Sequence, residues 1–218
     1  MADTEEYVTY EGVNAHIRIP DNPSGLVFIA PGALVSTESP LINAIQNAFE
    51  DRGMATVIAD IGISEVKMDD PTNVHGDFSK NLQTVIDGYY STHDYTPDTF
   101  ELAGHSMGGA ASLSITPDNP VSAITVFDPT PAPAERLSQI EAPVTIAVSQ
   151  IRSFKAAGHR ALERLGGSPN NHSIYELNTS QERHSGHMFV GAEDEIARII
   201  LNHSDDRDTD PSLNTLDL

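Results

Sequence analysis

The segment Gly104-His105-Ser106-Met107-Gly108 has the residue types of a turn that presents a nucleophile. It follows the apolar run TFELA and precedes the small-residue run GAASL. In a sharp strand-to-helix turn, side chains at positions 104 and 108 would clash, while the serine hydroxyl is exposed and the following N–H groups point into the same space. The alternative is a glycine-rich packing corner without chemistry. The position of the GHSMG segment between an apolar run and a small-residue run favours Ser106 as a nucleophile.

Strands and helices alternate along the chain after an opening hairpin. The expected strands are a pair within 5–20 with its turn at 12–14, then 25–32, 54–61, 99–106, 121–129, 142–150 and 173–179. The expected helices are 40–52, 77–90, 107–115, a short one within 132–140, 154–167 and 192–203. Apolar, β-branched strands separated by helices predict an α/β fold, with a mostly parallel sheet covered on both faces.

The carboxyl ends of parallel strands share one edge of a sheet, and ligands bind beyond that edge. The chemistry-bearing residues expected there are Asp60, Ser106, Asp128 and the loop around His187. The sequence therefore predicts that these segments, far apart along the chain, meet at one site.

With these residues in place, the chain resembles the α/β-hydrolase superfamily from about Tyr7 to His203. Its GHSMGG segment is similar to those of lipases, esterases and cutinases. The resemblance implies a doubly wound sheet and a catalytic triad in the order nucleophile, acid, histidine. The segment DPTPAPAERLSQIEAP has room for a short helix only, so no large cap domain is expected, and the site should be open and shallow.

Two histidines in the segment ERHSGHMFV are candidates for the catalytic base. A glycine-histidine pair followed by an apolar residue resembles the histidine site of the superfamily, which favours His187 over His184. The two lie three residues apart, but no further ligands cluster nearby, so no metal site is expected. His105 is interpreted as a packed histidine of the turn that points away from the nucleophile.

The acid departs from the commoner pattern of the superfamily. Many members carry it just after the penultimate strand, but here the sequence AVSQIRSFKAAGHRALE has no carboxylate before Glu163. The preceding strand ends in VFDPTP, and a minority of the superfamily places the acid there, so Asp128 is the expected acid. The alternative is that Asp128 only initiates a turn before Pro129. Asp60 also ends a strand, but it precedes the nucleophile and does not match the order.

An oxyanion hole needs two backbone N–H groups. One is expected from Met107, which follows the nucleophile, and the other from the loop APGALVS after the first buried strand. Pro31-Gly32 resembles the pair in front of the oxyanion residue in cutinase-like enzymes, which makes Ala33 the expected donor. Leu34 is the second candidate for this role and is otherwise expected to contact the substrate.

These residues imply a serine hydrolase that cleaves small or accessible carboxylic esters through an acyl-enzyme, without a metal or cofactor. Thioester hydrolysis, acyl transfer and peptide cleavage by the same triad remain open alternatives. A binding module that keeps the fold without catalysis is disfavoured, because degenerate members of the superfamily usually lose the serine or the histidine.

The charge is unusual: the chain has 32 acidic and 12 basic residues, for a formal net charge of -20. Lysine occurs only at Lys67, Lys80 and Lys155. Such a surface repels nucleic acids and anionic membranes, so neither is an expected partner. An acidic, lysine-poor composition resembles that of proteins from salt-loving microbes, although an ordinary acidic protein with an acidic tail is the alternative. The chain contains no cysteine, which excludes disulfides and thiolate chemistry.

The length of 218 residues suits one α/β-hydrolase domain at 1–204, followed by an acidic C-terminal tail at 205–218. No apolar stretch reaches the ~20 residues that span a bilayer. The acidic start MADTEEYVTY has no apolar signal region, so the expected location is the cytoplasm. A small-molecule ester is the expected partner, and a monomer or a homodimer the expected assembly.

Overall fold

A mixed eight-stranded sheet forms the centre of the computed structural model, which describes residues 4–33, 35–61, 71–95, 97–115, 120–180 and 182–205. The strand order is β1-β2-β4-β3-β5-β6-β7-β8. The strands are β1 (Thr4–Tyr10), β2 (Val13–Ile19), β3 (Leu26–Ala30), β4 (Ala55–Asp60), β5 (Phe100–His105), β6 (Ala123–Phe127), β7 (Val144–Val148) and β8 (His172–Glu176). β2 pairs antiparallel with β1 and β4, and the pairings from β4 to β8 are parallel. The predicted fold class is confirmed.

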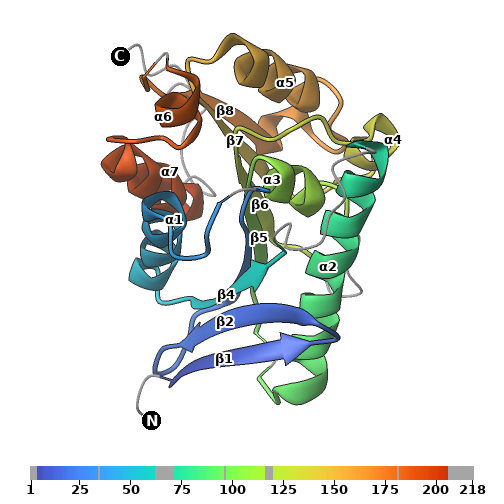
Figure 1. The fold of residues 1–218 in the computed structure, drawn as a ribbon, viewed down its shortest axis with the longest axis vertical. Coiled ribbons are helices and arrows are strands. Elements are labelled where there is room, and N and C mark those ends of the chain that lie inside the picture. The colour runs from blue at the N-terminus through green and yellow to red at the C-terminus, as the bar shows by residue number, and fades with distance from the viewer. Residues whose placement is uncertain are drawn as a thin grey trace.

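Helices cover both faces of this sheet (Figure 1). They are α1 (Pro40–Asp51), α2 (Pro71–Thr92), α3 (Met107–Ser112), α4 (Ala134–Leu137), α5 (Arg152–Leu162), α6 (Arg183–His187) and α7 (Glu193–Asp205), with a 3-10 turn at Pro169–Asn171. One apolar cluster joins the sheet to α1 and α7, and another joins it to α2, α3 and α4. Strands β3, β6 and β7 are buried along their whole length, which explains why their sequences are almost entirely apolar. None of the helices in the described ranges is long and apolar enough to cross a membrane.

The turn of the opening hairpin lies one residue earlier than expected. Tyr10 pairs with Val13, so the loop consists of Glu11 and Gly12 alone, with φ of 47° and 89°. The expected turn at 12–14 was wrong because a two-residue loop with both φ values positive matches the twist of the flanking strands. Val13 is therefore the first residue of β2, where its side chain is buried.

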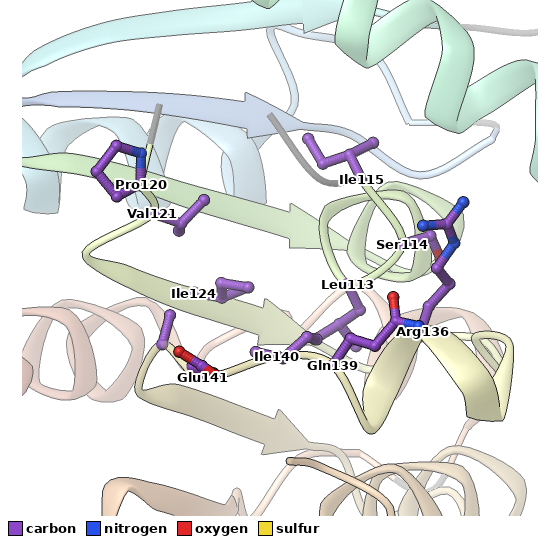
Figure 2. Close-up of a pocket in the computed structure, with 11 residues that line it drawn as sticks. Leu113, Ser114, Ile115, Pro120, Val121, Ile124, Arg136, Gln139, Ile140 and Glu141 are labelled. Carbon is purple, nitrogen blue, oxygen red and sulfur yellow. The ribbon is translucent and has the colours of Figure 1, made fainter. Parts of the chain in front are cut away.

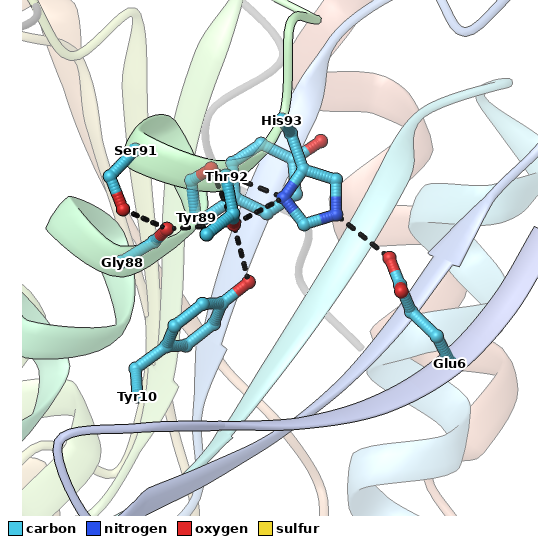
Figure 3. Close-up of polar contacts among 7 residues, drawn as sticks. All are labelled: Glu6, Tyr10, Gly88, Tyr89, Ser91, Thr92 and His93. Carbon is cyan, nitrogen blue, oxygen red and sulfur yellow. Dashed lines mark hydrogen bonds and ion pairs between the residues drawn. The ribbon is translucent and has the colours of Figure 1, made fainter.

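Polar contacts attach the hairpin to the C-terminal end of α2 (Figure 3). His93 Nε2 lies 2.7 Å from a carboxylate oxygen of Glu6, and the Tyr10 hydroxyl lies 3.3 Å from that of Thr92. The His93 ring also stacks on Tyr89 with 4.2 Å between ring centroids. The two antiparallel strands are thus held to the parallel part of the fold through side chains as well as through the sheet.

The parallel strands β3, β5, β6, β7 and β8 all point the same way, so their carboxyl ends lie along one edge. The turns that leave this edge carry Ser106, after β5, and Asp128, after β6. The sheet therefore brings the predicted site residues to one side of the molecule.

Candidate active site

Ser106 occupies a strained turn between β5 and α3. Its backbone has φ 54° and ψ -117°, a conformation that L-residues rarely adopt, and its side chain is largely buried. The neighbouring glycines permit this turn. A Cβ at Gly104 would lie 2.5 Å from the carbonyl oxygen of Gly108, and a Cβ at Gly108 would lie 2.0 Å from that of Ala30. The glycines thus let α3 start directly on the strand ends, with Ser106 at the corner.

Asp128 lies in the adjacent turn, immediately after β6. Its φ is 43°, and its side chain is fully buried. Backbone hydrogen bonds connect this turn to the first: Ser106 N donates to Phe127 O at 2.9 Å, and Thr130 N donates to Ser106 O at 3.1 Å. The two turns therefore hold each other in place.

The Asp128 carboxylate is paired with an imidazole from the C-terminal part of the chain. His187 Nδ1 lies 3.1 Å from Asp128 Oδ2. Because an ionised carboxylate only accepts hydrogen bonds, Nδ1 carries the proton, and Nε2 of a neutral His187 is left with a lone pair. The side chain of His187 is 21% exposed, so the ring reaches from a buried acid toward solvent.

His187 is the last residue of α6, a five-residue helix in a segment expected to be a loop. A Cβ at Gly186 would lie 2.0 Å from the carbonyl oxygen of Ser180, so a glycine allows this helix to pack closely. The His187 ring stacks on Phe154 of α5, with 4.0 Å between centroids and 2° between planes. Glycine and the aromatic residue together fix where the imidazole lies.

His105 contacts His187 from the turn. The two ring centroids lie 4.4 Å apart, and His105 Nε2 lies 2.9 Å from the His187 carbonyl oxygen. Because a carbonyl only accepts, Nε2 of His105 carries the hydrogen. Complete burial, and then the neighbouring His187, lower the pKa of His105 to about 3. His105 is therefore a neutral, packed residue that joins the turn to α6.

Solved structures with a similar arrangement of elements were found, although no protein-family profile and no curated protein sequence matches the chain. Dienelactone hydrolase from Anabaena variabilis superposes with a TM-score of 0.75 at 21% identity, over 93% of this chain and 97% of that one. Est1E from Butyrivibrio proteoclasticus gives 0.71 at 15% identity, over 93% and 98%. The chain has the α/β-hydrolase fold. An α/β serine hydrolase homologue from Coxiella burnetii agrees, with 0.70 at 18% identity, over 93% and 97%.

Within this α/β-hydrolase fold, the loop after β3 lies against Ser106. A Cβ at Gly32 would lie 3.0 Å from the Cβ of Ser106 and 2.9 Å from His105 Nδ1. Ala33, the next residue, is half-buried beside this contact, and Leu34 lies outside the described residues. Met107 begins α3, where its N–H has no intrahelical partner. The two predicted oxyanion donors thus belong to segments that border Ser106.

The alternative residues do not join this group. His184, at the second position of α6, is exposed, and Asp60, at the end of β4, is exposed as well. Among the described residues, neither forms a hydrogen bond or ion pair with Ser106 or His187. Among the described residues, the His187 ring is also not hydrogen-bonded to Ser106. In enzymes without substrate, such catalytic hydrogen bonds are often long and tighten only when substrate binds.

A cavity of about 300 Å³ lies elsewhere in the fold (Figure 2). Leu113, Ile124 and Ile140 are among its apolar lining residues, and Arg136 and Glu141 border it. It adjoins the start of β6 and the segment before β7, the end of the sheet opposite the turns of Ser106 and Asp128. Within the described residues, no three His, Cys, Asp or Glu side chains lie close enough to hold a metal ion.

Proposed function

We propose that this protein is a serine hydrolase that cleaves carboxylic esters, with Ser106 as nucleophile, His187 as general base and Asp128 as the acid that orients it. One observation carries the proposal: a fully buried carboxylate binds His187 Nδ1 at 3.1 Å, in a turn that is hydrogen-bonded to the backbone of a strained Ser106. A packing corner has no need of a buried acid paired with a partly exposed imidazole.

In the proposed mechanism, His187 Nε2 takes the hydroxyl proton while Ser106 Oγ attacks the ester carbonyl carbon. Asp128 holds the imidazole in the required tautomer and stabilises its charged form. The tetrahedral intermediate collapses as the C–O bond to the alcohol breaks, and the alcohol leaves with the proton from His187. Water then attacks the acyl-enzyme, His187 accepts its proton, and the carboxylic acid is released with Ser106 restored.

The N–H groups of Ala33 and Met107 are the proposed donors that stabilise the negatively charged oxygen of the tetrahedral intermediate. Each such donor contributes about 2.7–4 kcal/mol to transition-state stabilisation in a comparable hydrolase. The close approach of Gly32 to Ser106 supports this assignment, because it brings the loop after β3 against the nucleophile. Leu34 is proposed as a substrate contact on the same loop.

Small or accessible esters are the proposed substrates. The segment after β6 forms only the four-residue helix α4, so it supplies no large cap. The names of two similar structures, a dienelactone hydrolase and a carboxyl esterase from Tuber melanosporum, are consistent with ester substrates.

Covalent labelling tests the proposal directly. A fluorophosphonate probe should label the wild type at Ser106, and p-nitrophenyl esters of increasing acyl length should be cleaved, the short ones fastest. Ser106→Ala should lose labelling and turnover while keeping its melting temperature within a few degrees. Ser114→Ala, which changes another serine two residues after α3, is the matched control and should keep both labelling and turnover. Turnover by pure Ser106→Ala at the wild-type rate would exclude this nucleophile.

A further inference from the structure

Ser149 holds the buried carboxylate of Asp128 together with the histidine. It follows β7 directly, is 1% exposed, and donates two hydrogen bonds. Its backbone N–H reaches Asp128 Oδ1 at 2.7 Å, and its hydroxyl reaches Oδ2 at 2.6 Å. Since His187 binds the same Oδ2, this single oxygen accepts from a serine and from an imidazole. Both carboxylate oxygens are therefore fixed.

The direction of the Ser149 hydroxyl follows from its partners. An ionised carboxylate has no hydrogen to give, so the serine must donate. Ser149 Oγ also accepts a longer hydrogen bond of 3.4 Å from the N–H of Ile151, which leaves the hydroxyl hydrogen directed at Asp128. The polar chain thus runs from Ile151 through Ser149 to Asp128, where it meets the proton of His187.

We propose that Ser149 is a positioning residue for the Asp128–His187 pair, and that its hydroxyl sets both the plane of the carboxylate and the basicity of the imidazole. The proposal rests on the function proposed above. The backbone N–H alone fixes Oδ1 but leaves the carboxylate free to tilt about that contact. The hydroxyl removes this freedom, so that Oδ2 stays aligned with His187 Nδ1.

The hydroxyl also draws on the negative charge of Oδ2. Without it, more of that charge acts on His187, so the charged imidazolium is stabilised and the pKa of His187 rises. The carboxylate still faces His187 but is no longer held in one plane, and this looser geometry lowers turnover. A serine that only filled space would change stability without changing this titration, and the two roles are therefore separable.

Ser149→Ala is the variant that tests the proposal, because it keeps the backbone N–H and removes the hydroxyl. We expect kcat to fall about 10- to 100-fold with little change in KM, the range found when residues that orient metal-bound histidines are mutated. The acid limb of the pH profile of kcat/KM should move to higher pH. NMR titration of the His187 ring should show the same rise in its pKa, in a readout that needs no turnover.

Two further serine variants keep the test decisive. Ser149→Thr retains the hydroxyl and should restore the His187 titration and most of kcat. Ser149→Cys, with a weaker donor, should give an intermediate shift, and it serves as the test variant if the alanine protein does not fold. Thr145→Val removes another buried hydroxyl on β7, one that lies 3.2 Å from Ser173 Oγ, and should leave the titration unchanged.

An unchanged His187 titration in the folded alanine or cysteine variant would overturn the proposal. So would a shift of equal size in Thr145→Val. If the wild type cleaves no ester and takes up no probe, the proposed function falls, but the titration still decides whether Ser149 controls the imidazole.

Discussion

His105 and Ser106 are adjacent residues that the fold stabilises in different ways. Ser106 carries backbone strain at a corner where the chain leaves the sheet, and such strain persists only when the surroundings determine the conformation. His105 is completely buried and neutral, with Nδ1 unpaired among the described residues and Nε2 bound to the His187 carbonyl. An uncharged, buried histidine therefore packs beside the turn in addition to its glycines.

Acid should destabilise the fold through His105. Its pKa is lowered to about 3 in the folded protein, against 6.5 for an ordinary histidine, because burial disfavours the charge. The unfolded chain therefore binds a proton first, and the stability from a neutral His105 is complete above pH ~6.5 and is lost as pH falls toward ~3. Chemical denaturation from pH 7 to pH 4 measures this loss.

His105→Gln isolates this contribution from that of the many carboxylates, because the amide does not titrate and still has a donor for the His187 carbonyl. Its free energy of unfolding should fall less steeply with acid than that of the wild type, by a few kcal/mol over the range, since each pKa unit corresponds to ~1.4 kcal/mol. Parallel curves would show that His105 does not control acid stability.

Asp128→Asn should preserve the fold and lower kcat by roughly 10⁴-fold, because a neutral amide favours the wrong imidazole tautomer. Steady-state kinetics with a short-chain ester measure the effect. The matched control is Asp60→Asn, the exposed alternative acid at the end of β4, which should keep kcat near that of the wild type. The reverse pattern would move the acid to Asp60.

Among the elements, α6 and α3 are short helices whose positions depend on glycines rather than on helical periodicity. α6 has five residues and α3 has six, too few for an amphipathic pattern. Each is docked where a side chain would collide with a backbone carbonyl, at Gly186 and at Gly108. Such helices are positioned by close packing of the backbone, which a hydrophobic pattern does not reveal.

Gly186→Ala should displace α6 and with it His187. The added Cβ would lie 2.0 Å from the Ser180 carbonyl oxygen, so the backbone must shift. We expect a stability loss of about 1–3 kcal/mol, as for other overpacked sites, and a larger proportional loss of kcat. Thermal melts and ester kinetics measure the two effects.

Gly76→Ala is the matched control for this substitution. Gly76 lies in α2, and apart from its own helix turn no atom of the described residues lies within 4 Å of its added Cβ. Alanine should therefore stabilise the helix by roughly 0.5–1 kcal/mol and leave kcat unchanged. If Gly186→Ala is as active as Gly76→Ala, the packing of α6 does not control the histidine.

At the scale of the whole molecule, the net charge of -20 opposes folding, because like charges repel one another across the compact surface. Ion pairs within the chain leave this net charge unchanged, but they place some acids beside a base; among the described pairs are Arg52 with Glu101 and Arg18 with Glu5. The pair of Arg52 and Glu101 is largely buried and bidentate, with distances of 2.9 and 2.6 Å. The 12 lysines and arginines are too few to pair one to one with 32 acids.

Stability should therefore rise with salt. The Debye length falls from ~10 Å at 0.1 M to ~3 Å at 1 M, so molar salt screens most repulsion between surface carboxylates. We expect the melting temperature and ester turnover to increase together from low to molar potassium chloride. Removing the residues after Ser204 should leave most of the effect, because the tail holds only a small share of the 32 acids. A melting temperature that stays flat across this range would reject salt adaptation.

The sequence by itself determined the order and type of the main elements. Continuous apolar strands, helical spacing at 40–52 and small residues around Ser106 are local patterns, and each acts over a few residues. For this reason the parallel sheet, the turn at Ser106 and the strand-end position of Asp128 were all predictable. The hairpin turn was misplaced by one residue, since twist matching depends on how the two strands pair.

Only the tertiary structure decided what lies around the carboxylate. Asp128 follows β6, Ser149 follows β7 and His187 ends α6. The contacts among them depend on β6 and β7 being neighbours and on α6 packing against the residues that follow these strands. The same holds for His105, whose ionisation is set by burial against a segment 82 residues away. Local patterns specify elements because they act between near neighbours, whereas hydrogen bonding and desolvation at this site act between residues that only the folded chain brings together.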